Sequence, residues 1–157
     1  MTVRKILIAV DLSALASDVI RYGCRIATSL KAKVKVIHAV PNVATWKGYE
    51  PSLPASLEEE MTQTAKTKLQ GYIDDAKAAE PDVTDCIEDV AVLAGNPTLM
   101  ICTTASDEKF DMIVVGYRGH SALERLLVGS TASNVIRYAS TSVLLYRPDE
   151  TEEPAKS

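Results

Sequence analysis

Three glycines and a Ser-Thr pair stand close together in the stretch GYRGHSALERLLVGST, which follows the apolar run FDMIVV. Gly116 and Gly119 let the backbone approach a ligand closely, because glycine has no Cβ atom and adopts positive φ without strain. Gly129, Ser130 and Thr131 stand where a helix is expected to begin, and the unpaired N–H groups of a helix N-terminus attract anions. The spacing therefore predicts two turns that together bind a polyphosphate.

Two charged residues are expected to belong to this site, whereas one histidine is expected to lie in the core. Arg118, between the first two glycines, is expected to neutralise phosphate charge. Asp11 follows the first apolar run, ILIAV, and its carboxylate can accept hydrogen bonds from a ribose or an exocyclic amine. The simpler interpretations are an ordinary strand-to-helix loop for the glycines and a turn or helix cap for Asp11. His38, inside a strand pattern, is expected to be a buried, hydrogen-bonded core residue.

The common nucleotide-binding motifs are absent from the sequence. A P-loop requires GxxxxGK[ST], and no lysine follows these glycines; the dinucleotide fingerprint GxGxxG is missing after the first strand. The nucleophile motif GxSxG and the His/Cys spacing of a zinc site are also absent. We therefore expect a site without catalytic residues or protein metal ligands, which holds a nucleotide through amides and hydroxyls.

Alternating apolar and amphipathic segments define the elements that position these residues. We expect strands at 6–10, 33–40, 86–93, 111–116 and 142–147, and helices at 13–30, 57–79, 97–107 and 131–138. Ser13 and Asn96 are the expected N-caps of the first and third helices, with Pro97 in the first helical position. Residues 41–57, rich in proline, form a long irregular loop. This alternation predicts an α/β fold, an open parallel sheet with helices on both faces.

The sheet places the chemistry at one edge. Ligands of open parallel sheets bind beyond the carboxyl ends of the strands, where the direction of winding reverses. Asp11 follows the first strand and Gly116 ends the fourth. The glycine stretch therefore belongs to a binding site at this edge.

Size and composition restrict the function. The 157 residues fit a single domain, placed at 1–148, with a polar, disordered tail at 149–157. The formal net charge of −4 argues against nucleic-acid binding. No apolar run approaches the roughly 18 residues that span a bilayer, so membrane insertion is not expected. The three widely spaced cysteines are expected to be buried free thiols, which suits a cytoplasmic location.

The complete pattern G-x2-G-x9-G-[ST], filled by Gly116, Gly119, Gly129 and Ser130, stands between ILIAVDLS near the start and TSVLLYRP near the end. On these segments residues 4–148 closely resemble the universal stress protein family, in the ATP-binding subgroup that carries this motif. The resemblance implies five parallel strands in the order 3-2-1-4-5, a Rossmann-like fold similar to the adenine nucleotide alpha hydrolases.

The resemblance also implies a ligand and a partner. The implied ligand is ATP, with or without Mg²⁺. The implied partner is a second copy of the chain, bound through the last strand, Ser142 to Tyr146. An apolar edge strand needs such cover, since it would otherwise expose unpaired backbone. The predicted nucleotide-binding residues are Val10, Asp11, Ala39, Val115, Gly116, Arg118, Gly119, Gly129, Ser130 and Thr131.

Two positions depart from the family pattern. Tyr117 stands where a small or basic residue is common, and Leu12 stands where glycine is frequent. A tyrosine here either narrows the pocket or stacks on a base. The function expected first is an adenine-nucleotide-dependent stress or signalling switch read by another protein. The alternatives are a slow Mg²⁺-dependent ATPase or nucleotidyl-transfer enzyme, and a dimeric scaffold that binds no nucleotide.

Overall fold

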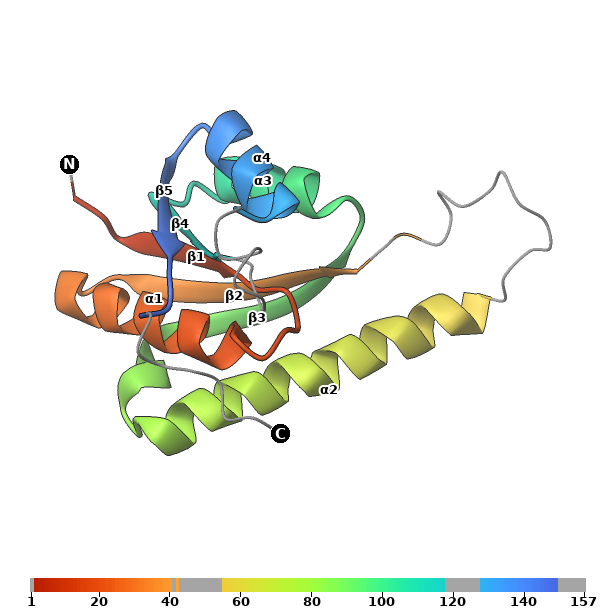
Figure 1. The fold of residues 1–157 in the computed structure, drawn as a ribbon, viewed down its shortest axis with the longest axis horizontal. Coiled ribbons are helices and arrows are strands. Elements are labelled where there is room, and N and C mark those ends of the chain that lie inside the picture. The colour runs from red at the N-terminus through yellow and green to blue at the C-terminus, as the bar shows by residue number, and fades with distance from the viewer. Residues whose placement is uncertain (1, 41, 43–54, 118–127, 150–157) are drawn as a thin grey trace.

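The structure, a computed structural model, describes residues 2–40, 42, 55–117 and 128–149. Strands and helices alternate along the chain, as the apolar pattern predicts (Figure 1). The elements are β1 (Lys5–Ala9), α1 (Ala16–Leu30), β2 (Lys33–Val40), α2 (Ala55–Ala79), the 3₁₀ turn η2 (Val83–Cys86), β3 (Ile87–Ala94), α3 (Pro97–Asp107), β4 (Met112–Gly116), α4 (Ser130–Tyr138) and β5 (Ser142–Tyr146).

The five strands form one parallel sheet in the order β3-β2-β1-β4-β5, so the predicted α/β fold and strand order are confirmed. Helices α1 and α2 cover one face of the sheet, and α3 and α4 cover the other (Figure 1). The winding reverses between β1 and β4, because the chain builds outward from β1 to β2 and β3, and then from β4 to β5.

The central strand β1 shows why this sequence forms a sheet that is covered on both faces. Ile6, Leu7 and Ile8 are completely buried. Ile6 and Ile8 belong to the core under α1 and α2, whereas Leu7 belongs to the core under α3 and α4. Successive side chains of a strand point to opposite faces, so a continuous apolar run satisfies two cores at once.

The helix starts test the predicted caps. The Asn96 side chain accepts a hydrogen bond from the Leu99 backbone N–H at 3.0 Å, and Pro97 takes the first position of α3, as predicted. The prediction for the first helix was wrong. Helix α1 begins at Ala16 without a side-chain cap from its N-cap residue Leu15, and the Ser13 carbonyl oxygen accepts from the Ala16 N–H at 3.0 Å. The turn before α1 uses backbone bonds instead of the serine hydroxyl.

The loop predicted at 41–57 is shorter than expected at its far end, because α2 already begins at Ala55. Of this loop the structure describes residue 42 and the residues from 55 on, so a role for the remainder stays a prediction. The division into one domain, 1–148, and a polar tail also stays a prediction, since residues 150–157 lie outside the described part.

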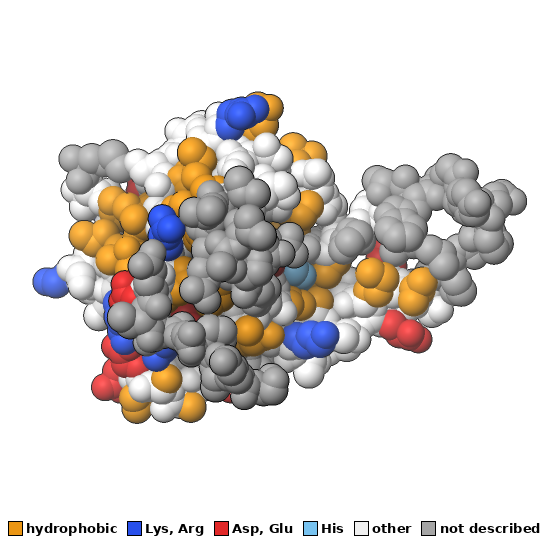
Figure 2. Space-filling view, in the orientation of Figure 1, with side chains coloured by type: hydrophobic (Ala, Val, Ile, Leu, Met, Phe, Trp, Pro, Cys, Tyr) orange, Lys and Arg blue, Asp and Glu red, His pale blue; other side chains and the backbone are white. Residues whose placement is uncertain are grey.

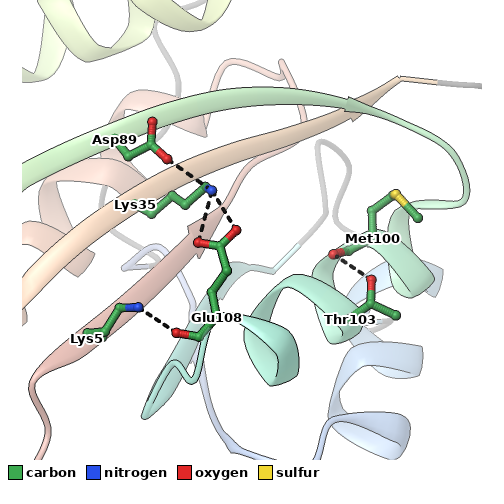
Figure 3. Close-up of polar contacts among 6 residues, drawn as sticks. All are labelled: Lys5, Lys35, Asp89, Met100, Thr103 and Glu108. Carbon is green, nitrogen blue, oxygen red and sulfur yellow. Dashed lines mark hydrogen bonds and ion pairs between the residues drawn. The ribbon is translucent and has the colours of Figure 1, made fainter.

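At the edge where the strands begin, charged side chains fasten α3 to the sheet (Figure 3). The Lys35 ammonium group of β2 lies 3.0 Å from Asp89 of β3 and 2.8 Å from Glu108, which follows α3. Lys5 donates to the Glu108 backbone carbonyl. Burial lowers the pKa of Lys35, but its bonds to Glu108 and Asp89 outweigh burial and raise the pKa overall. One lysine therefore joins two strands and a helix end.

A second contact at this edge joins β1 to the start of β4. The Asp111 carboxylate accepts hydrogen bonds from the backbone N–H groups of Arg4 and Lys5 at 2.8 and 2.9 Å. These bonds hold the pKa of Asp111 below its ordinary value, because they stabilise the charged carboxylate.

The surface in Figure 2 shows acidic and basic side chains close together at the left end of the molecule, where β1 and β2 begin in Figure 1. Among the described helices, none is both long enough and apolar enough to cross a membrane. All three cysteines are free. Cys24 is buried as predicted, whereas Cys86 and Cys102 are only half-buried because each lies at the margin of a core.

Candidate functional site

A cavity of about 200 Å³ lies at the carboxyl ends of β1, β2 and β4, at the point where the winding of the sheet reverses. The starts of α3 and α4 and the segment before α1 complete its wall. Its lining residues are Ala9, Val10, Asp11, Ser13, Leu15, Val19, Ile37, His38, Ala39, Pro97, Ile101, Val115, Gly116, Tyr117, Gly129, Thr131 and Ala132. The cavity therefore stands where sequence analysis places the chemistry.

The structure brings together most of the residues predicted to bind a nucleotide. Those that line the cavity are Val10, Asp11, Ala39, Val115, Gly116, Gly129 and Thr131. Ser130, the first residue of α4, is exposed and is not part of the lining. Arg118 and Gly119 lie outside the described residues, so their predicted contacts stay predictions.

The end of β1 is held rigidly by β2. The backbone N–H of Val10 donates to the Ile37 carbonyl at 3.0 Å. The Val10 carbonyl accepts from the Nδ1 atom of His38 at 2.8 Å. A carbonyl can only accept, so Nδ1 carries a proton and the Nε2 atom of a neutral His38 is an acceptor. The predicted hydrogen bond of His38 is confirmed, but the ring is half-buried and lines the cavity instead of lying inside the core.

Asp11 follows this fixed strand end. Its Oδ1 atom accepts a hydrogen bond from the backbone N–H of Ser13 at 3.3 Å, which forms the turn that sequence analysis gave as the simpler interpretation. The residue is exposed and lines the cavity. A carboxylate has several lone pairs, so the same group can take part in a turn bond and in bonds to a ligand.

Gly116 has a packing role that the glycine pattern does not suggest. It ends β4 in an extended conformation, without the positive φ that glycine permits. A Cβ atom at this position would stand 2.8 Å from the Cγ2 atom of Val19, a buried residue of α1. Gly116 is therefore required for close packing of α1 against the cavity floor, and Val19 itself lines the cavity.

The N-terminus of α4 forms one side of the cavity. Gly129 is the N-cap residue, and among the described residues no side chain caps the first turn. Uncapped N–H groups at the start of a helix carry a partial positive charge and seek an acceptor from outside the helix. Because Thr131 and Ala132 also line the cavity, this turn can present amides and a hydroxyl to an anion.

Tyr117 connects the cavity to the edge strand β5. Its backbone N–H donates to the Tyr146 carbonyl at 2.7 Å, and its buried ring lies 5.0 Å from the Arg147 guanidinium. The Tyr146 ring in turn packs against Tyr22 of α1, with ring centroids 4.9 Å apart. The Tyr117 side chain thus forms part of the cavity wall and reduces the open volume of the cavity.

Several lining residues were not among the predicted set. Ser13, Leu15, Val19, Ile37, Pro97, Ile101 and Ala132 all belong to this group. The rule that strand ends and the following turns form the site could have identified Ile37, beside Ala39, and Pro97, at the start of α3. Val19 could not have been found this way, because it reaches the cavity from the second turn of a helix.

The described residues contain no group of three or more His, Cys, Asp or Glu side chains that could hold a metal ion. Asp11 is the only acidic residue in the cavity lining described above. Among the described residues, the polar groups at the cavity therefore include the Asp11 carboxylate, the His38 ring, the strand-end backbone and the start of α4.

Comparisons with known proteins agree with the fold. The model of the universal stress protein family matches residues 2–147. Universal stress protein A homolog 1 of Coxiella burnetii is 30% identical over 146 residues, which cover 92% of this chain and 96% of that protein.

Two solved structures share the fold. One is a universal stress protein in complex with cAMP, which is 25% identical, has a TM-score of 0.65, and aligns over 93% of this chain and 98% of its own. The other is the universal stress protein of Archaeoglobus fulgidus in complex with dAMP, which is 23% identical with a TM-score of 0.62, over 92% of this chain and 98% of its own.

The family match covers nearly all of the chain, and its length is close to that of the curated relative. The strand order, the cavity at the reversal of winding and the glycine pattern fit together with that match. This chain belongs to the universal stress protein family.

Proposed function

We propose that this chain binds an adenine nucleotide, ATP in the first place, and acts as a nucleotide-dependent switch. The observation that carries the proposal is the cavity at the reversal of winding, closed on one side by the N-terminus of α4, which begins at a glycine N-cap. Such a helix end favours phosphate through its N–H groups and its dipole.

Different lining residues of the cavity suit different parts of a nucleotide. Ile37, Val115 and Ala132 offer apolar surface for a base, and His38 and the strand-end backbone offer polar groups beside it. The volume of about 200 Å³ is below the range of about 300–1,000 Å³ typical of sites that enclose a whole drug-sized ligand. The base and ribose would occupy this cavity, and the phosphates would lie toward Gly129.

The carboxylate at the cavity also indicates how Mg²⁺ could be held. This ion usually keeps several waters and binds through one or two carboxylates together with substrate phosphates. Asp11 supplies one carboxylate at the cavity. The residues present therefore fit an ion that arrives with ATP and is held mainly by its phosphates.

The relatives support the class of ligand. The two solved relatives are complexes with cAMP and dAMP, both of which are adenine nucleotides. The missing P-loop lysine and the absence of a GxSxG nucleophile in the sequence favour binding over phosphoryl transfer. A ligand that binds one conformation more tightly than another shifts their populations, which is how a binding module without chemistry can signal.

Calorimetric titration of the nucleotide-free protein with ATP, ADP, AMP and cAMP, with and without Mg²⁺, tests the proposal. Ser130→Asp places a negative charge on the first turn of α4, so we expect it to weaken ATP binding about tenfold or more, which corresponds to about 1.4 kcal/mol. Asn134→Asp, one turn further along the same helix, is the matched control and should bind ATP almost normally.

Both variants should remain folded, since an acidic residue in the first turn stabilises a helix and Asn134 is exposed. Equal affinity of both variants and the original chain would remove α4 from the site. Failure of every adenine nucleotide to bind at millimolar concentration would overturn the proposed function.

We further propose that two copies associate through β5 (Ser142–Tyr146). β5 is one of the two edge strands of the sheet, with β3 at the other edge. Four of its five side chains are half-buried, and unpaired backbone at an edge favours pairing with another chain. Leu144→Lys should therefore give monomers in light scattering, and Val90→Lys, the matching change on β3, should leave dimers. A monomeric original chain at about 100 μM would contradict the proposal.

A further inference from the structure

Two cysteines from separate elements meet on the face of the sheet covered by α1 and α2. Cys24 lies in α1 and is completely buried. Cys86 ends η2, is half-buried, and its Sγ atom lies 3.8 Å from the Cys24 carbonyl oxygen and 3.4 Å from the Val83 carbonyl oxygen. The Cys86 sulfur therefore lies against residue 24 itself, although the two residues are far apart in the sequence.

The surroundings make the two sulfurs unequal. The hydrogen bond from the Cys24 thiol lowers the pKa of Cys86 to about 7, and a bond from Thr28 acts in the same direction. Burial and the charge of Asp85 oppose these bonds without cancelling them. The same thiol pair raises the pKa of Cys24 far above its ordinary value, and burial adds to the rise. Cys86 is thus the more acidic thiol of the two, and Cys24 is the one that keeps its proton.

We propose that Cys24 and Cys86 form an oxidisable thiol pair, which a hydroperoxide converts into an intramolecular disulfide. The argument rests on the contact of the Cys86 Sγ atom with Cys24, 3.8 Å from its carbonyl oxygen, and on the unequal exposure of the two residues: an oxidant from solvent reaches the half-buried Cys86 but not the buried Cys24. The pair is independent of the proposed nucleotide site.

The chemistry proceeds in two balanced steps. The Cys86 thiolate attacks one peroxide oxygen, the O–O bond breaks, and the leaving hydroxide takes a proton, which gives a sulfenic acid and one water. The Cys24 sulfur then attacks the Cys86 sulfur, the S–O bond breaks, and a second water leaves with the Cys24 proton. Two thiols are oxidised and one hydroperoxide is reduced.

The second step becomes easier because of the first. While Cys86 is a thiolate, its charge and its hydrogen bond keep the proton on Cys24. Conversion of Cys86 to a neutral sulfenic acid removes both effects, so Cys24 loses its proton more readily at the moment when it must attack.

The place of the pair in the fold determines what the bond would do. Cys86 directly precedes β3, at the edge where the strands begin, whereas the cavity lies at the edge where they end. A disulfide would tie α1 to the connection between α2 and β3. It would stabilise that end of the molecule without filling the cavity.

Cys102 provides a control within the same chain. It lies in α3, on the other face of the sheet, and is half-buried like Cys86. Burial raises its pKa, so it is expected to be a poor nucleophile at neutral pH. Exposure alone would oxidise Cys86 and Cys102 to similar extents, whereas the proposed pair oxidises Cys86 selectively.

The experiment treats the reduced full-length chain with one equivalent of hydrogen peroxide at neutral pH, alkylates the remaining thiols, and cleaves at methionine. Met61 and Met100 place Cys24, Cys86 and Cys102 in three different fragments. We expect a disulfide between the Cys24 and Cys86 fragments and an alkylated Cys102. Cys102→Ser should behave like the original chain.

Two further measurements keep the test decisive. The rate at which iodoacetamide alkylates Cys86 should rise with a midpoint near pH 7. In Cys24→Ala this midpoint should move upward, toward the ordinary thiol value of 9.0, and peroxide should leave a sulfenic acid that dimedone traps. If that variant does not fold, the fragment map of the original chain still decides. Equal oxidation of Cys86 and Cys102, or no link between Cys24 and Cys86, would overturn the proposal.

Discussion

The two ends of the parallel strands use polar groups in opposite ways: at one end these groups bind one another, and at the other they surround a cavity. At the edge where the strands begin, charged groups bind one another or the backbone: Lys35 joins Asp89 and Glu108, and Asp111 binds the N–H groups of Arg4 and Lys5. At the edge where the strands end, the chain surrounds a cavity of about 200 Å³, and no side chain in the described part of the chain caps the first turn of α4.

This difference separates structure from function within a single sheet. Groups that are satisfied by internal partners stabilise the fold, and they have little capacity left for a ligand. Backbone amides that are not capped by a side chain favour an external acceptor. The position of charged residues in the sequence therefore says less about binding than the presence or absence of internal partners does.

The largest effect is expected at Gly116, where an added Cβ would stand 2.8 Å from the Cγ2 atom of Val19. Gly116→Ala should reduce the free energy of unfolding by about 2 kcal/mol in chemical denaturation, because it overpacks the cavity floor. It should also weaken nucleotide binding, since Val19 lines the cavity.

Two further variants test the cause of this loss of stability. Val19→Ala in the same chain should recover part of the loss, so the double variant should be more stable than the sum of the single effects. Gly71→Ala in α2, where a Cβ would meet nothing within 4 Å, should be neutral or stabilising by up to about 1 kcal/mol. An unchanged stability of Gly116→Ala would mean that Val19 can move aside freely.

A smaller effect is expected from Lys35→Met at the opposite edge. The variant keeps the side-chain length but removes the charge that bridges Asp89 and Glu108, so we expect a loss of about 1 kcal/mol in the same measurement. Nucleotide affinity should be unchanged. The Lys33 side chain is 67% exposed and, among the described residues, is paired with Glu88 alone. Lys33→Met should therefore alter the free energy of unfolding by less than about 0.5 kcal/mol. A change in affinity with Lys35→Met would break the separation of the two edges.

The smallest effect concerns acid stability. The folded pKa of Asp111 lies below its ordinary value of 3.8, so its stabilising contribution is present above that pH and is lost as the pH falls toward the folded value. Asp111→Asn keeps an acceptor but cannot titrate. It should be slightly less stable than the original chain at pH 7, and the difference should shrink below about pH 4. A constant difference across this range would show that Asp111 acts without its charge.

The sequence alone determines the order of elements and the general position of the site. Continuous apolar runs such as ILIAV demand cover on both faces, and the alternation with amphipathic segments then leaves a parallel α/β sheet. The cap at Asn96 follows from the same local rules. The glycine stretch after β4 and Asp11 after β1 are placed at one edge because parallel strands all end on the same side.

Only the tertiary structure decides which residues meet across long separations. Val19 reaches the cavity through its contact with Gly116, and Cys24 meets Cys86 across an intervening strand and helix. No local pattern marks either contact, since each depends on how α1 packs against the sheet and against η2. Local sequence fixes periodicity and turns over a few residues, whereas packing sets the distances between elements; the cavity and the thiol pair are products of packing.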